Sequence, residues 1–244
     1  VGCVGVLTPL EGAQVTDDRP TILHNEARAV SHHGVFAVCD GVENIPIRHV
    51  PNAVILQANH GRETVLFDDP VTGREYALMG CSNKTAIVEV TDPTKCRMVT
   101  NVPHSEGLWS DIKVYKEMCY VSTENSGSGI QVIDLSQIDQ GKATLIKTLP
   151  NPGRSHTIAL DPVGAFLYTC GSNEGVPKGA TTAFCLKDPK DPVMTGAPTL
   201  TPVYQHEAQV VTYQSGKYKG KTVLFGGGEG RGLEIWDVTD KDKP

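Results

Sequence analysis

The sequence predicts an all-β fold, because turn residues are abundant and short apolar runs recur along it without long helical periods. Of its 244 residues, 25 are Gly and 16 are Pro, which suits many turns and short strands. One short helical turn is expected, between Ser136 and Gly141. The length allows one large domain, since all-β folds often form single units of this size.

Composition excludes several classes of protein. The chain carries 28 Asp and Glu against 22 Lys and Arg, a net charge of −6, so a strongly basic nucleic-acid binder is excluded. No apolar run approaches the roughly 20 residues of a transmembrane segment. The chain begins at Val1 without the basic region of a signal peptide, so we expect a processed or partial chain.

A recurring phrase predicts the architecture. It consists of an apolar strand, a short polar or acidic residue, a Val or Leu, and a turn. We call its polar residue the repeat position; it is occupied by Glu89, Asp134, Cys185 and Asp237, at spacings of 45, 51 and 52 residues. Periods of this length with several short strands each are typical of propeller blades, so we predict a β-propeller of four-stranded blades.

Each period also contains the earlier strands that a blade requires. Residues 111–115 and 118–122 read as a hairpin joined by Lys116 and Glu117. The other periods predict strands at 63–67 and 75–80, 156–160 and 165–170, and 206–213 and 221–225. Four blades are thus predicted within residues 61–244, and residues 1–60 are expected to form another blade or ring-closing strands.

The start of the first strand in each blade lines the central channel of a propeller, so residues there meet from distant points in the sequence. The predicted channel residues are Glu63, Asp111, His156, His206 and Glu207. One interpretation is a divalent metal ion held by His156, His206, Asp111 and Glu207. The other is a hydrated polar channel whose side chains bond to loop amides and water.

Four further features are interpreted more simply. Trp109 is expected to pack between blades, with ligand stacking as the alternative. The Gly-rich segment 226–232 precedes a strand and not a helix, so no nucleotide cofactor is expected there. The seven Cys lack a CxxC pair and are interpreted as buried thiols, or as one or two disulfides. Asn83 begins a glycosylation sequon, which matters only in a secreted chain.

Several motifs together resemble a known family. They are Trp109–Tyr115, Gly129–Leu135, Ser155–Ile158 and His206–Val211, with Asp69–Leu78 and Ser82–Ala86 before them. With these the chain, over residues 63–244, resembles the choice-of-anchor B family of LVIVD-repeat β-propellers. The resemblance implies a secreted or surface-attached protein with six or seven blades and no established reaction. The chain departs from the pattern at Glu207, where the family's usual residue is Asp, and at Cys185.

Together these features predict a secreted or cell-surface module that binds a protein or surface partner, without enzymatic activity and with a metal ion as an optional channel component. The alternative is a metal-dependent enzyme, a hydrolase such as a lactonase or an oxidase, that uses His156, His206 and Glu207 on a small molecule. A structural subunit of an extracellular assembly is a third hypothesis.

Overall fold

The computed structural model describes residues 35–37, 47–50, 53–56, 64–92, 95–195, 204–241 and 243. Its strands form five sheets, and four of these are antiparallel meanders that follow one another along the chain. The predicted all-β class is therefore confirmed. The one helical element of the described residues is a short 3-10 turn at Ile138–Gln140, inside the segment where a turn was expected. None of the described residues belongs to a helix long and apolar enough to cross a membrane.

The first two meanders have four strands each. The first comprises β4 (Thr64–Asp68), β5 (Glu75–Gly80), β6 (Lys84–Glu89) and β7 (Arg97–Pro103). The second comprises β8 (Ser110–Tyr115), β9 (Met118–Thr123), β10 (Ile130–Gln137) and β11 (Lys142–Leu149). Tyr115 pairs with Met118, so the hairpin predicted at Lys116 and Glu117 is confirmed.

The third meander also has four strands and the fourth has three. The third comprises β12 (Thr157–Asp161), β13 (Phe166–Ser172), β14 (Ala180–Cys185) and β15 (Val193–Thr195). The fourth comprises β16 (Gln205–Thr212), β17 (Thr222–Gly228) and β18 (Gly232–Asp237). The strands predicted for these two periods agree with the observed ones to within a few residues.

A fifth sheet lies in the N-terminal segment. β3 (Ala53–Leu56) pairs with β2 (Ile47–Val50) antiparallel and with β1 (Val35–Ala37) parallel. Most of residues 1–60 lie outside the described residues, so their predicted role as an extra blade or as ring-closing strands remains a prediction.

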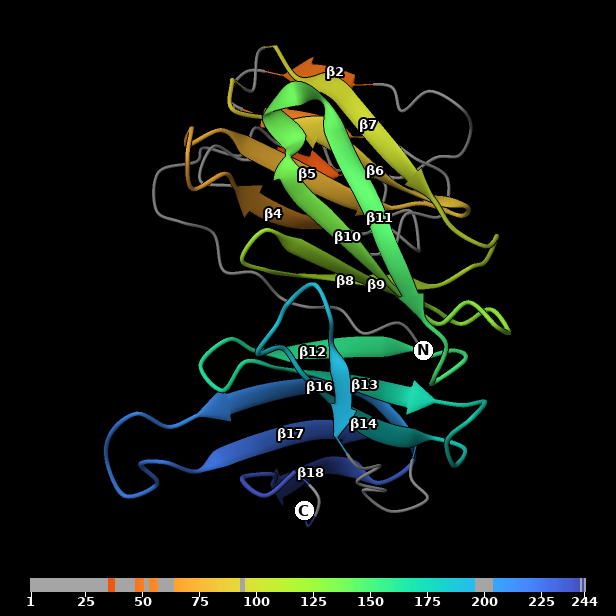
Figure 1. Ribbon diagram of the computed structural model, residues 1–244, viewed down its shortest axis with the longest axis vertical. Coiled ribbons are helices and arrows are strands. Elements are labelled where there is room, and N and C mark those ends of the chain that lie inside the picture. The colour runs from red at the N-terminus through yellow and green to blue at the C-terminus, as the bar shows by residue number, and fades with distance from the viewer. Residues whose placement is uncertain are drawn as a thin grey trace, which may run out of the picture.

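Consecutive meanders pack face to face. Alternate residues of a strand point to opposite faces of its sheet, so one strand can contribute to two cores. In β9, Cys119 and Val121 join the core shared with the first meander, whereas Met118 and Tyr120 join the core shared with the third. A further core, which includes Tyr168 and Leu224, lies between the third and fourth meanders. The meanders consequently follow one another along the long axis of the molecule (Figure 1).

The repeat position has the same structural role in all four meanders. It lies near or at the end of the third strand, and the aliphatic residue after it turns back into the core. We call these residues the turn aliphatics: Val90, Leu135, Leu186 and Val238. Each is at most 1% exposed. Each donates its backbone N–H, at 2.8 or 2.9 Å, to a carbonyl of the first residue of the second strand or of the residue just before it. The equivalence inferred from spacing is confirmed.

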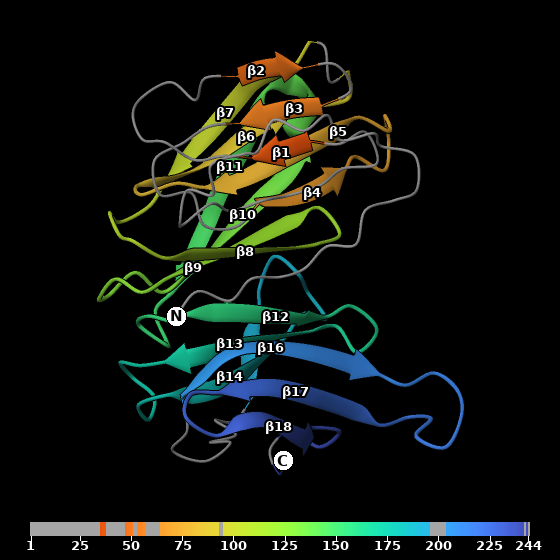
Figure 2. The ribbon, with the colours of Figure 1, turned by 180° about the vertical axis from the view of Figure 1, so that it is seen from behind.

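The first strands of the meanders, β4, β8, β12 and β16, lie side by side in that order, and we call them the inner strands. Figure 2 shows β8 above β12 and β12 beside β16. No sheet among the described residues closes on itself. The stacked meanders with adjacent first strands are therefore established, and the closed propeller remains a prediction.

Candidate functional site

The predicted channel residues lie where the inner strands begin, an end of the sheets that we call the site end. Asp111 pairs with Ser122 and Glu207 pairs with Gly227. In each of these meanders, the repeat position pairs with one residue of the second strand, and Ser122 or Gly227 lies four residues after that residue. Asp111 and Glu207 therefore occupy equivalent positions in their meanders. His156 and His206 each lie one position earlier. Glu63 lies outside the described residues.

Asp111 ties two inner strands together. Its side chain is 6% exposed, and Oδ2 accepts the backbone N–H of Ile158 on β12 at 2.7 Å. Oδ1 accepts the N–H of Ile112 at 2.7 Å and the Nζ of Lys113 at 2.8 Å. This is the amide-bonded arrangement expected of a residue that organises a polar channel.

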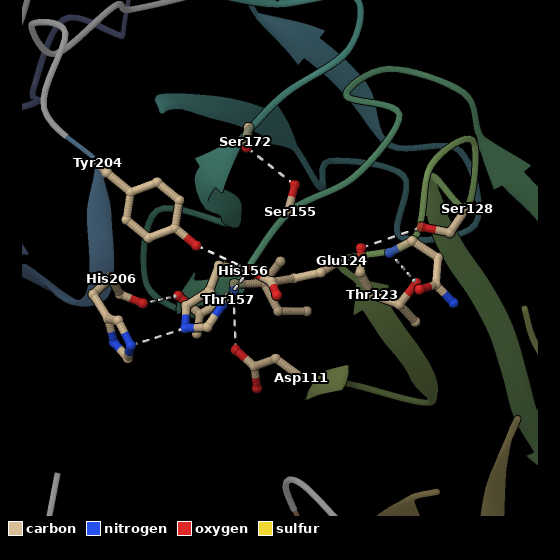
Figure 3. Close-up of polar contacts among 12 residues, drawn as sticks. Asp111, Thr123, Glu124, Ser128, Ser155, His156, Thr157, Ser172, Tyr204 and His206 are labelled. Atoms are coloured by element: carbon tan, nitrogen blue, oxygen red, sulfur yellow. Dashed lines mark hydrogen bonds and ion pairs between the residues drawn. The ribbon is translucent and has the colours of Figure 1, made fainter. Parts of the chain in front are cut away.

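His156 is the centre of a polar cluster drawn in Figure 3. Its side chain is 10% exposed and its Nδ1 lies 2.6 Å from Oε1 of Glu124. The same oxygen accepts the hydroxyl of Tyr204 at 2.9 Å. The hydrogen bond from His156 holds the pKa of Glu124 below its usual range, despite the opposing effect of burial. Because an ionised carboxylate only accepts, Nδ1 of His156 carries the proton.

His206 faces the other side of the His156 ring. The two Nε2 atoms are 3.1 Å apart, and the ring centroids are separated by 4.2 Å. Burial lowers the pKa of His206, and the neighbouring His156 lowers it further. When Nδ1 of an imidazole carries the ring's one proton, Nε2 presents a lone pair, so Nε2 of His156 can accept a hydrogen bond or bind a metal ion. The prediction that these two histidines meet is confirmed.

Glu207 does not join these rings through any hydrogen bond that the structure describes. Its pKa is raised, because its carboxyl group is desolvated and lies near Asp111. Among the described residues, the one hydrogen bond to its Oε1 comes from the N–H of Ala208, at 3.3 Å. A carboxyl group whose pKa is shifted by its surroundings at such a site is a candidate acid or base.

Gly171 allows the cluster to assemble. Its φ of +59° is in the left-handed region, and an added Cβ would lie 2.7 Å from Cζ of Tyr204 and 2.9 Å from Cβ of His156. No larger residue fits without moving one of these side chains. Because Gly171 has no side chain, the rings of His156 and Tyr204 can approach each other, and their centroids are 5.7 Å apart.

An apolar pair borders the histidines. Trp109 is 46% exposed and its ring centroid lies 6.0 Å from that of His156 in an edge-on arrangement. Leu108 beside it is 61% exposed. Trp109 therefore contacts the cluster and also faces solvent, so it is only partly buried at the position where packing between blades was expected, and the alternative of ligand stacking stays open.

Sequence reasoning missed Glu124, Arg154 and Tyr204. All three lie in loops at the site end, and Glu124 follows the second strand of its meander. No repeat pattern marks them, because the loops vary between meanders. Their detectable property is position: Glu124 directly follows a second strand, and Arg154 and Tyr204 lie just before inner strands, so all three must lie near the start of an inner strand.

The remaining predictions have mixed outcomes. The five cysteines in the described residues are free, as the buried-thiol interpretation requires, and burial raises the pKa of Cys96 to about 11. Cys3 and Cys39 lie outside those residues. The Gly-rich segment 226–232 spans the end of β17, the turn at residues 229–231 and the first residue of β18, so a strand follows the turn. Asn83 lies in an exposed turn.

A metal centre is not preformed in the part of the chain that the structure describes, where no three His, Cys, Asp or Glu side chains cluster as ligands. The metal ion therefore remains a prediction. No protein-family model matches the chain, and no curated protein matches it. The resemblance to the choice-of-anchor B family rests on the sequence motifs alone.

Proposed function

We propose that the four meanders are consecutive blades of a β-propeller. In the fourth meander Ile235 is 62% exposed, although its equivalents Ile87, Val132 and Ala183, two residues before each repeat position, are fully buried by the next meander. Leu233 is 68% exposed in the same way. An exposed face of this kind is expected where a further sheet packs.

Labelling of Ile235→Cys tests this architecture wherever the chain is part of a longer protein. We expect a maleimide to react slowly there, and quickly in the 244-residue chain, because a further blade would bury the thiol. End-on electron-microscopy averages would show a ring. Fast labelling in both proteins, or an open stack of sheets, would contradict the propeller.

As its function, we propose a secreted or cell-surface binding module whose contact surface is the site end. The observation that carries this proposal is the rim patch, defined as Leu108, Trp109, His156 and His206. It presents an exposed aromatic ring and an exposed aliphatic side chain on sheets whose interiors are fully buried. Aromatic anchors on a rigid surface are typical of protein interfaces. The family resemblance supports secretion.

Partner capture by matched variants tests the rim patch. The chain and its variants would be immobilised and exposed to the extracellular fraction of the source, and retained proteins identified by mass spectrometry. We expect a partner retained by the unmodified chain and by Leu145→Ala, which alters a 41% exposed residue of β11, to be lost with Trp109→Ala. An identical set for all three, or none, would argue against this function.

A metal-dependent enzyme is the second candidate, favoured by the contact between Glu124 and His156. In many metal sites of proteins, a carboxylate accepts a hydrogen bond from the histidine ring nitrogen that does not bind the metal. Two histidine nitrogens that bind one Zn²⁺ tetrahedrally, each about 2.0–2.1 Å from the ion, would lie about 3.3 Å apart. This separation is close to the 3.1 Å between the Nε2 atoms of His156 and His206. Glu207 or water would complete the coordination.

Calorimetric titration with Zn²⁺ distinguishes the two candidates. If the enzyme hypothesis holds, Zn²⁺ binds the unmodified chain, His156→Ala abolishes the binding, and a lactone or ester screen shows turnover that a chelator removes. Absence of binding and of chelator-sensitive turnover would reject it and leave the binding module.

A further inference from the structure

A cavity separate from the rim patch opens at the same end of the sheets. Its volume is about 170 Å³. The lining residues that matter here are Glu124, Arg154, Ser155, Ser172, Lys178 and Tyr204. Because His156, His206 and Trp109 do not line it, the cavity is a second potential site and does not depend on the proposed function.

Buried hydroxyl groups contribute to the wall of the cavity. Ser155 and Ser172 have no exposed surface, and their Oγ atoms are 3.0 Å apart. Ser172 also donates its hydroxyl to Oγ1 of Thr169 at 2.7 Å, and its carbonyl accepts the N–H of Gly179 at 2.8 Å. Figure 3 shows Ser155 and Ser172 facing each other near Tyr204. These bonds fix the polar wall before any ligand arrives, which lowers the cost of binding.

Two cationic side chains supply positive charge. Within the described residues Lys178 has no ion pair. Nε of Arg154 lies 3.6 Å from Oε1 of Glu174, whose other oxygen accepts the N–H of Gly127 at 2.9 Å. That ion pair orients the guanidinium from one side and leaves further N–H donors of Arg154 for another acceptor. The two cations are suited to bind a carboxylate.

Glu124 supplies the opposite charge. Its Oε1 is used by His156 and Tyr204, while no hydrogen bond from the described residues reaches Oε2. A glutamate carboxyl group is ordinarily ionised at neutral pH. The cavity therefore combines a free carboxylate oxygen with two cationic groups, which a simple anion site would not contain.

We propose that this cavity binds a small zwitterion, in the size range of a free α-amino acid, whose carboxylate meets Arg154 and Lys178 and whose ammonium meets Glu124. The volume of about 170 Å³ accommodates a small molecule such as a short amino acid. The hydroxyl of Tyr204 provides a further polar contact, while the fully buried hydroxyls of Ser155 and Ser172 hold the wall behind the ligand.

Isothermal titration of the whole chain tests the proposal with glycine, alanine and serine, and with acetate and ethanolamine as the carboxylate-only and ammonium-only controls. We expect a zwitterion to bind at least about tenfold more tightly than either control, because each control leaves one charged group of the cavity unpaired. Lys178→Met should weaken zwitterion binding by about tenfold or more, whereas Lys187→Met, at another exposed lysine, should not change it.

Each other outcome would overturn the inference. Absence of binding at millimolar concentration would reject the site, and acetate binding equal to that of alanine would reject the zwitterion class. Equal affinities for the Lys178→Met and Lys187→Met variants would place any binding elsewhere. Because Lys178 is exposed, loss of folding does not confound that comparison. Trp109→Ala, which tests the rim patch, should leave zwitterion binding intact, so the two proposals fail separately.

Discussion

The two ends of the sheets are built in different ways. At the end that carries the repeat positions, every meander uses the same device, a turn aliphatic that is at most 1% exposed and bonds back to the second strand. At the site end, each meander contributes a different residue, among them Asp111, His156 and His206. The comparison shows that repetition maintains the stack, while variation between meanders produces the polar surface.

The largest expected effect is at the repetitive end. Leu135→Ala removes a fully buried side chain from the core between the first two meanders, so we expect the free energy of unfolding to fall by about 3 kcal/mol. Leu145→Ala, at a 41% exposed position, should change it by less than about 0.5 kcal/mol. Urea unfolding followed by fluorescence measures both. Equal losses would mean that the turn aliphatic is not a packing device.

Asp111→Ala tests whether the site end also stabilises the stack. The change removes the carboxylate that accepts the N–H groups of Ile112 and Ile158, so we expect a loss of about 2 kcal/mol. Asp191→Ala breaks an exposed pair with Lys147 and should cost less than about 1 kcal/mol. If Asp111→Ala were as mild as Asp191→Ala, the bridge between inner strands would not contribute to stability.

The same contrast explains what the sequence could predict. The strands, the hairpin at Lys116 and the equivalence of the repeat positions follow from local periodicity, which a single chain displays directly. The meeting of His156 and His206 also follows, since equivalent positions of adjacent inner strands lie together. The alignment of His156 with Asp111 was one position off, because a strand boundary depends on ladder pairing that periodicity does not fix.

The rest of the site depends on contacts between loops. Glu124 contacts His156, which is 32 residues away in the sequence, and Tyr204, which is 80 residues away. Such contacts arise from the path of each loop after its strand ends, and no residue pattern encodes that path. The cavity is a further example, because it exists only where loops of several meanders converge.

Gly171→Ala should separate backbone strain from the assembly of the cluster. An alanine there adopts a left-handed φ, which costs about 1 kcal/mol, and its Cβ also displaces Tyr204 or His156. Gly127→Ala has a similar φ of +70° with open space around the added atom, so it reports the backbone cost alone. We expect Gly171→Ala to lose about 1 kcal/mol more in urea unfolding. Equal losses would mean that the cluster tolerates the methyl group.

The smallest effect concerns the pH dependence of stability at the site end. The pKa of His206 is lowered in the folded chain by burial and by His156, so the folded state binds its proton less readily than the unfolded state does. The contribution of His206 to the free energy of unfolding is fully present above the unfolded pKa of about 6.5. It is lost as pH falls through the lower folded pKa. His206→Gln should therefore flatten the decline in unfolding free energy between about pH 7 and pH 5.

Glu207 opposes this trend and provides the internal check. Its raised pKa means that the folded state holds its proton more tightly, so its contribution is present below the unfolded value of about 4.3 and is lost as pH rises through the folded pKa. Glu207→Gln should accordingly make stability rise more steeply with pH just above 4, the opposite sign to His206→Gln. Unfolding curves for both variants across this range measure the two slopes. A change of the same sign in both would show that the two groups do not titrate in the environments described for them.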